Sequence, residues 1–442
     1  MTTNPSAAPS TTQSTALLTD HYELTMVQAA LASGNAERRC VFELFPRTLP
    51  DSRRYGVVAG VGRALDALER FCFDDEVLCA LAEHQVVDEP TLEWLSTYRF
   101  GGDVWGYPEG ETYFPYSPLL IVEATFAEAV VLETLLLSIL NHDSAIASAA
   151  SRMTWAAAGR PCIEMGSRRT HEEAAVAAAR AAYIAGFDTT SNLAAGHRYG
   201  VPTAGTSAHS FTLLHDSERD AFTAQVHSLG RGTSLLVDTF DVAEAVAMGV
   251  EIAGPELGAV RIDSGDLGML ATKVREQLDR LGATHTRIIV TSDLDEFSIA
   301  ALAAAPVDGY GVGTALVTGS GYPTCGLVYK LVAREVGDGA ERRMAPIAKK
   351  SKGKVSVGGR KYAARRLDDD GVADAELIGI GAPPEEGKLR PLLVPLVRSG
   401  EVVGREPLAV ARERHARSRE ELPLQARQLS RGVPVIPTEF VG

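Results

Sequence analysis

The sequence has few cysteines, and their spacing matches neither a metal site nor a disulfide framework. Five cysteines occur in 442 residues, with no Cys-x-x-Cys pair and no histidine at a zinc-ligand distance. An odd number of scattered cysteines is typical of reduced thiols, so we expect a cytoplasmic protein.

Long hydrophobic runs and a secretion signal are also missing. The first fifteen residues carry no charged side chain, and no basic stretch precedes an apolar one there, so we expect a loose tail over 1–16 without a signal. The longest apolar run, 129–140, is interrupted by Glu133 and is too short to span a bilayer. This run predicts a buried helix, and we expect no membrane partner.

Positive charge is scarce over the chain as a whole. The formal net charge is −14, which argues against nucleic acid as a partner because such binding needs clustered cations. Two basic clusters are exceptions, at 349–366 and 412–419. Glycines interrupt the first cluster, so it predicts a loop suited to a small polyanion.

Apolar runs and helical patterns alternate along the middle of the chain. Such alternation predicts parallel strands with covering helices. No Gly-x-Gly-x-x-Gly turn follows the first run, which favours an α/β fold of the (β/α)₈ barrel type, and a doubly wound open sheet stays the alternative. The eight predicted strands are 119–124, 161–165, 186–190, 201–205, 234–238, 259–263, 287–291 and 309–313.

Polar and glycine residues follow these runs, at the ends where barrel enzymes carry their reactive groups. His209 lies among small residues in Gly-Thr-Ser-Ala-His-Ser, which leaves the imidazole open to a phosphate. Arg261 and Asp263 could pair with phosphate and hold a ribose diol or Mg²⁺. Gly311, Gly313 and Thr314 offer unobstructed backbone N–H groups for a phosphate monoester.

Taken as an ordered set, these motifs resemble the nicotinate phosphoribosyltransferase family over about residues 17–365. The residues that carry the resemblance are 18–26, Glu164-Met-Gly-Ser-Arg-Arg169, Thr190-Ser-Asn192, Gly205-Thr-Ser-Ala-His-Ser210, Arg261-Ile-Asp-Ser-Gly-Asp266 and Gly311-Val-Gly-Thr314. Two positions depart from the family pattern. Met165 stands where many relatives carry an aromatic residue, and Val357-Gly-Gly359 lacks a preceding proline.

The resemblance implies an irregular barrel joined to an N-terminal α/β sandwich and followed by a C-terminal extension. We expect the sandwich over 17–117, completed by later segments, the barrel over 118–325, and a C-terminal segment over 326–442. The implied reaction forms nicotinate mononucleotide and diphosphate from nicotinate and 5-phosphoribosyl 1-diphosphate. ATP hydrolysis would be coupled through a phosphohistidine, with Mg²⁺ as cofactor, in a homodimer with shared active sites.

The resemblance also implies roles for individual residues. His209 would be the phosphorylated histidine and, with Arg261 and Asp263, would form the catalytic group. Asp238 and Asp263 are the candidate Mg²⁺ ligands. The remaining candidate substrate contacts are Tyr22 from the neighbouring subunit, Arg168, Ser191, Asn192, Thr206, Ser264, Ser292, Gly311, Gly313, Thr314, Lys349 and Lys354.

Other functions remain open on the sequence. A nicotinamide-specific enzyme would suit an acidic residue where this chain has Ser191, so Ser191 together with Arg168 favours an acid substrate. A quinolinate enzyme would bind a second carboxylate and would not need the His209 motif. A barrel aldolase would need a lysine at a strand end, which none of the eight runs has, and a non-catalytic barrel that binds a phosphate ligand is the remaining alternative.

Overall fold

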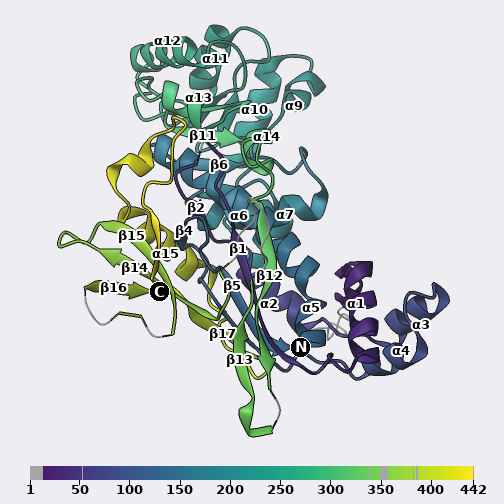
Figure 1. Ribbon diagram of the computed structural model, residues 1–442. Coiled ribbons are helices and arrows are strands. Elements are labelled where there is room, and N and C mark those ends of the chain that lie inside the picture. Colours follow the sequence, from purple (N-terminus) through teal and green to yellow (C-terminus); the bar gives the residue numbers. More distant parts are fainter. Residues whose placement is uncertain are drawn as a thin grey trace, which may run out of the picture.

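The computed structural model describes residues 13–51, 53–337, 339–348, 357–381, 383–384 and 387–441. Lys349 and Lys354 lie outside these residues. Within them the chain forms two large sheets, two smaller ones and the helices that cover them (Figure 1).

The site of interest belongs to a six-stranded parallel sheet of order β7-β6-β11-β10-β9-β8. All its neighbouring strands are parallel, so their carboxyl ends meet at one edge. The sheet is a partial barrel, which confirms the mixed α/β class with an irregular barrel. Its strands are β6 (Cys162–Glu164), β7 (Thr189–Thr190), β8 (Ser234–Leu236), β9 (Ala259–Ile262), β10 (Arg287–Ser292) and β11 (Gly309–Val312).

Two of the eight predicted barrel strands are wrong. The run 119–124 forms β5 (Leu120–Thr125), which pairs antiparallel with two strands of the other large sheet. Strand β5 is buried or half-buried along its whole length, as a barrel strand is, so the apolar run does not distinguish the two. The run 201–205 contributes only an isolated parallel bridge between Thr203 and Thr190.

The second large sheet has seven strands in the order β13-β12-β1-β5-β3-β17-β18, all of them antiparallel to their neighbours. Strands from the first third of the chain form its centre and strands from the last third flank them on both sides, so residues after β11 return to complete the N-terminal part. Its strands are β1 (Arg39–Pro46), β3 (Asp103–Gly106), β5, β12 (Leu327–Val336), β13 (Arg343–Pro346), β17 (Val394–Arg398) and β18 (Glu401–Val402).

Two smaller sheets lie beside it. The first joins β16 (Lys388–Pro391), β14 (Lys361–Leu367), β15 (Ala373–Ile380) and β19 (Thr438–Val441), and the second joins β2 (Gly56–Val57) to β4 (Thr112–Tyr113). None of these strands was predicted from the sequence.

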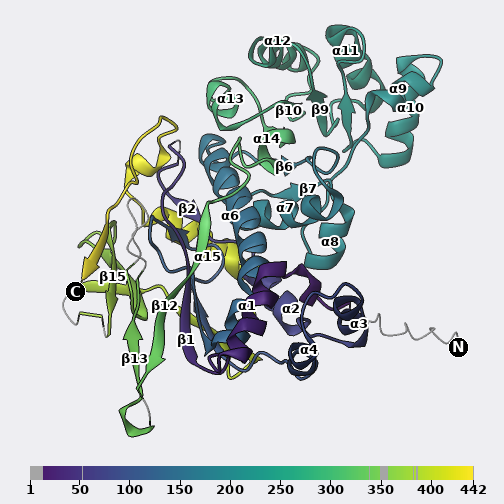
Figure 2. The ribbon, with the colours of Figure 1, turned by 45° about the vertical axis from the view of Figure 1, so that its right-hand side comes forward.

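The helices divide between the two large sheets. Figures 1 and 2 show α9 to α13 around the parallel sheet, α1 to α4 beside the seven-stranded sheet, and α6 and α7 between the two sheets. The helices are α1 (His21–Ala32), α2 (Val61–Glu69), α3 (Asp75–Glu83), α4 (Glu89–Ser96), α5 (Phe126–Val130), α6 (Glu133–Ala156), α7 (Glu172–Ile184), α8 (Leu193–Tyr199), α9 (His209–Leu214), α10 (Glu218–Leu229), α11 (Val242–Ala253), α12 (Leu267–Arg280), α13 (Glu296–Ala301), α14 (Thr314–Val317) and α15 (Leu408–Glu420).

Helix α6 is the central helix of the molecule. It packs against α2, α7, α13 and the strands β2 and β12. The helical segment 126–156 is long and apolar enough to cross a membrane by length and composition, but 67% of its most apolar window is buried inside the protein. It is therefore the core helix that the apolar run 129–140 predicts.

Candidate active site at the carboxyl edge of the parallel sheet

Most of the predicted site residues gather at one end of the parallel sheet. A pocket of about 230 Å³ opens there, lined by Met165, Arg168, Arg169, Asp263, Ser292, Asp293, Gly313 and Thr314. These residues follow β6, β9, β10 and β11, whose carboxyl ends share an edge. This is the edge at which barrel enzymes carry their reactive groups, so the pocket is a candidate active site.

His209 begins α9 and faces two carboxylates. Its Nε2 lies 3.7 Å from Oδ1 of Asp238 and 4.0 Å from Oδ2 of Asp263. Its Nδ1 lies 3.1 Å from the hydroxyl oxygen of Thr239, within hydrogen-bond distance. The imidazole is 41% exposed, so a phosphoryl donor can reach it while the carboxylates orient the ring.

Hydrogen bonds fix the carboxylate of Asp238 next to His209. Its Oδ2 accepts hydrogen bonds from the backbone N–H of Asp263 (2.9 Å) and the hydroxyl of Ser264 (2.7 Å). Its Oδ1 is buried and has no hydrogen-bond partner among the described residues. A buried carboxylate oxygen without a donor is costly, so it fits a cation or a charged imidazole when the site is loaded.

Asp263 and Asp238 together can supply part of a magnesium shell. Within the residues that the structure describes, no three His, Cys, Asp or Glu side chains converge into a metal cluster. Mg²⁺ is commonly held by one or two carboxylates together with substrate phosphates and water. The unpartnered Oδ1 of Asp238 and the adjacent Asp263 match that pattern.

Arg261 points toward the His209 loop. Its guanidinium donates to the hydroxyl of Thr206 (2.9 Å) and the carbonyl of Ser207 (3.0 Å). Burial lowers the pKa of Arg261, the carboxylates of Asp263 and Asp238 oppose this shift, and neighbouring Arg168 adds to it.

The glycines after β11 are constrained by the residues around them. A Cβ on Gly311 would lie 2.5 Å from Cγ2 of Thr291 and 2.7 Å from Sδ of Met165. On Gly313 it would lie 3.4 Å from the carbonyl oxygen of Met165, which is ordinary contact. Gly311 thus keeps β10 and β11 close, while Gly313 leaves its backbone open at the pocket.

The remaining predicted residues take different positions. Ser191 is exposed after β7, and Asn192 caps α8 by accepting from the N–H of Ala195 (2.8 Å). Ser292 ends β10 with a φ of +149°, an unusual backbone for a residue with a Cβ. Tyr22 lies on α1, apart from the parallel sheet in both views (Figures 1 and 2), so it does not reach this pocket within one subunit.

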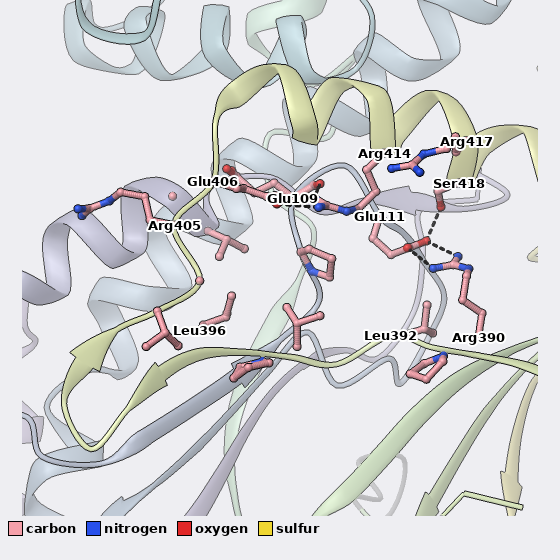
Figure 3. Close-up of a pocket in the computed structure, with 18 of the residues that line it drawn as sticks. Glu109, Glu111, Arg390, Leu392, Leu396, Arg405, Glu406, Arg414, Arg417 and Ser418 are labelled. Carbon is pink, nitrogen blue, oxygen red and sulfur yellow. Dashed lines mark hydrogen bonds and ion pairs between the residues drawn. The ribbon is translucent and has the colours of Figure 1, made fainter.

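A larger cavity lies elsewhere, and charged side chains in it are already paired. About 550 Å³ opens between α15 and the strands β16 and β17 (Figure 3). Several of its charged side chains already pair with one another, as Arg390 does with Glu111 and Arg414 does with Glu406. The carboxyl edge of the sheet, with an unpartnered carboxylate oxygen and an accessible histidine, is the better candidate active site.

Comparisons with known proteins identify the family. The family model for the nicotinate phosphoribosyltransferase N-terminal domain matches residues 17–141. A nicotinate phosphoribosyltransferase of Mycobacterium tuberculosis H37Rv is 58% identical over 435 residues, covering 96% of this chain and 95% of the relative. One from Bacillus subtilis is 38% identical, covering 80% and 74%.

Solved structures match over nearly the full length. Human nicotinic acid phosphoribosyltransferase superposes with a TM-score of 0.81 at 26% identity, covering 96% of this chain and 97% of the human chain. A nicotinate-nucleotide pyrophosphorylase from Pyrococcus furiosus superposes with a TM-score of 0.75 at 25% identity, covering 95% and 99%. The fold is thus that of an α/β-barrel phosphoribosyltransferase. The chain belongs to the nicotinate phosphoribosyltransferase family.

Proposed function

We propose that this enzyme forms nicotinate mononucleotide and diphosphate from nicotinate and 5-phosphoribosyl 1-diphosphate in NAD salvage in the cytoplasm. The pyridine nitrogen bonds to the anomeric carbon as the bond to diphosphate breaks. The observation that carries the proposal is the meeting of Arg168, Asp263 and Gly313 in one pocket beside His209 and Arg261. This places anion-binding groups and ribose-facing carboxylates around a single reacting centre.

Each group has a role in this reaction. Arg168 pairs with the nicotinate carboxylate, and Ser191 and Asn192 complete that end of the pocket. Gly311, Gly313 and Thr314 hold the 5-phosphate through backbone N–H groups, while Arg261 and Thr206 contact the remaining phosphate groups. Asp263 offsets the positive charge that develops on the ribose, and Ser264 and Ser292 hydrogen-bond to the same substrate. When bound by Asp238 and Asp263, Mg²⁺ would neutralise charge on the diphosphate.

ATP enters through His209. A ring nitrogen attacks the γ-phosphorus, the bond to the β-phosphate oxygen breaks, and ADP leaves; water later cleaves the phosphohistidine to inorganic phosphate. The small residues around His209 let its loop change position when the ring carries a phosphate. Phosphorylation therefore favours the closed form of the site, which improves substrate capture without entering the ribosyl transfer.

The active enzyme is a homodimer whose subunits share each site. Apolar side chains are exposed on the loops and helices that follow the strands of the parallel sheet, and a second exposed group lies near Tyr22. Exposed apolar clusters of this kind mark interfaces between proteins. The first group is Leu193, Leu213, Leu214, Phe240 and Phe297, and the second is Leu17, Leu18 and Tyr22.

The partner's Tyr22 would supply the aromatic face that Met165 lacks. Burial raises the pKa of Tyr22 to about 12, and the charges of Glu133, Glu23 and Asp20 act in the same direction. The phenol therefore stays protonated and can stack on the pyridine ring.

The test is product formation by the purified protein. It is incubated with Mg²⁺, 5-phosphoribosyl 1-diphosphate and nicotinate, with and without ATP, and nicotinate mononucleotide is followed by chromatography. We expect product whose rate rises with ATP. Product from nicotinamide but not from nicotinate would refute the assignment of Arg168 and Ser191, and ligand binding without diphosphate release would identify a non-catalytic barrel.

A further inference from the structure

Glu164 is a buried acidic residue at the active-site edge for which the reaction above has no use. It ends β6, is fully buried, and has no ion-pair partner among the described side chains. Its Oε1 accepts the backbone N–H of Gly166, and its Oε2 accepts the hydroxyl of Thr190. The carboxylate thus joins the loop after β6 to the end of β7.

These contacts belong to a closed ring of hydrogen bonds. The hydroxyl oxygen of Thr190 also accepts the backbone N–H of Asn192 (2.9 Å), and the amide Nδ2 of Asn192 donates to the hydroxyl of Ser167 (3.0 Å). Ser167 follows Gly166, which closes the ring on the loop that carries Arg168. A separate bond from the N–H of Ser191 to the carbonyl of Glu164 (2.8 Å) ties the same two loops again.

The loop after β6 packs closely against the carboxylate of Glu164. A Cβ on Gly166 would lie 2.2 Å from Cγ1 of Val317 and 3.0 Å from Oε1 of Glu164. Burial raises the pKa of Glu164, and the hydrogen bonds from Thr190 and Gly166 oppose this shift. Burying a carboxyl group without a cation beside it lowers the stability of the fold. If this position served only packing, an apolar side chain would be more stable there.

We propose that Glu164 is a positioning residue, whose carboxylate joins the loop of Arg168 to the loop of Ser191 and Asn192 and so fixes the end of the pocket that receives the pyridine carboxylate. The inference rests on the proposed function, because it concerns the nicotinate end of that site. The 5-phosphate cradle at Gly311 and Gly313 belongs to β11 and the residue after it, and β11 pairs with β6 on the side opposite β7. Loss of the ring should therefore affect nicotinate more than 5-phosphoribosyl 1-diphosphate.

Glu164→Gln and Thr190→Val each break one link of the ring. The glutamine keeps an acceptor for Gly166 but presents an amide donor to Thr190, while the valine removes the hydroxyl altogether. We expect the KM for nicotinate to rise about tenfold in each variant, as is typical when groups behind a ligand-contacting residue are lost. The KM for 5-phosphoribosyl 1-diphosphate and kcat should stay within about twofold of wild type.

The chain offers a conservative variant and a matched control. Thr190→Ser keeps the hydroxyl and should restore the KM for nicotinate. Thr189→Val alters the adjacent residue of β7, whose buried hydroxyl has no hydrogen-bond partner among the described residues, and should leave both KM values unchanged. If Glu164→Gln does not fold, the three threonine variants still decide the question.

Two kinetic outcomes would overturn the inference. One is a nicotinate KM within about twofold of wild type in both ring variants. The other is a parallel change in both KM values and in kcat, which would show a general structural role. A wild-type enzyme that forms no nicotinate mononucleotide would overturn the proposed function and this inference together, whereas normal wild-type turnover with unaffected ring variants would overturn the inference alone.

Discussion

Mixing two impaired variants tests whether each active site draws on both subunits. Tyr22 on α1 and His209 on α9 lie far apart within one subunit in both views (Figures 1 and 2). If Tyr22 serves the partner's site, Tyr22→Ala and His209→Ala damage different components of each shared site. In a mixed dimer, one site then receives intact Tyr22 and intact His209, and the other site receives neither.

The size of the recovery follows from this geometry. Each mixed dimer has one intact site of two, so about half of the sites are intact in the purified mixed dimer, against about one quarter in a random mixture of equal amounts. Stacking of an aromatic side chain on a base contributes about 1–3 kcal/mol, so Tyr22→Ala alone should raise the nicotinate KM about 5- to 150-fold. His209→Ala alone should lose the stimulation by ATP.

The assay is the ATP-stimulated rate at a nicotinate concentration well below the KM of the Tyr22→Ala variant. Subunits with different tags are co-expressed, and the doubly tagged dimer is purified before measurement. The control pairs His209→Ala with His209→Asn, whose defects coincide and should not complement. A doubly tagged Tyr22→Ala and His209→Ala dimer that is no more active than its parents would refute the shared site.

Three further predictions concern single residues. His209→Asn should abolish the stimulation by ATP and keep the ATP-independent rate. The control variant His215→Asn, at the end of the same helix, should keep both rates. Stimulation by ATP that persists in His209→Asn would refute a phosphohistidine at this position. Arg168→Gln should raise the nicotinate KM about tenfold or more, because a charge-assisted pair contributes about 1.5–3 kcal/mol, and should narrow the preference for nicotinate over nicotinamide. Burial and, to a lesser degree, the charge of Arg419 lower the pKa of His415 to about 3. The unfolded chain therefore binds the extra proton first, and stability should fall by about 2 kcal/mol between pH 6.5 and pH 5, measured by urea unfolding, with a shallower slope in His415→Asn.

The positions of the reactive groups were predictable because one geometric rule links them to the sequence. Met165, Asp238, Asp263 and Ser292 each stand at or just after the end of an apolar run, and parallel neighbours bring such ends to one edge. The rule depends only on where each apolar run ends along the sequence. It does not need the number of strands, so it placed these residues correctly although two of the eight strands were assigned wrongly.

The errors arose where the same pattern suits two structures. The run 119–124 is apolar throughout and buried in either a barrel or an antiparallel sheet, and only its pairing with β1 and β3 distinguishes them. The strand β17 lies near the end of the chain and pairs with β3, which lies in its first third. Local periodicity carries no signal for such long-range pairing.

The role of Glu164 could not be predicted from the sequence, although the residue lies within a recognised motif. The sequence places it beside Met165 and Arg168 and so marks the segment, but its carboxylate acts on Thr190, which is 26 residues away. Burial, the absence of a cation and the return of the chain through Asn192 to Ser167 appear only once β6 and β7 are paired. Residues that touch substrate are thus open to prediction from strand ends, whereas residues that hold those contacts in place become visible only through the pairing of strands distant in sequence.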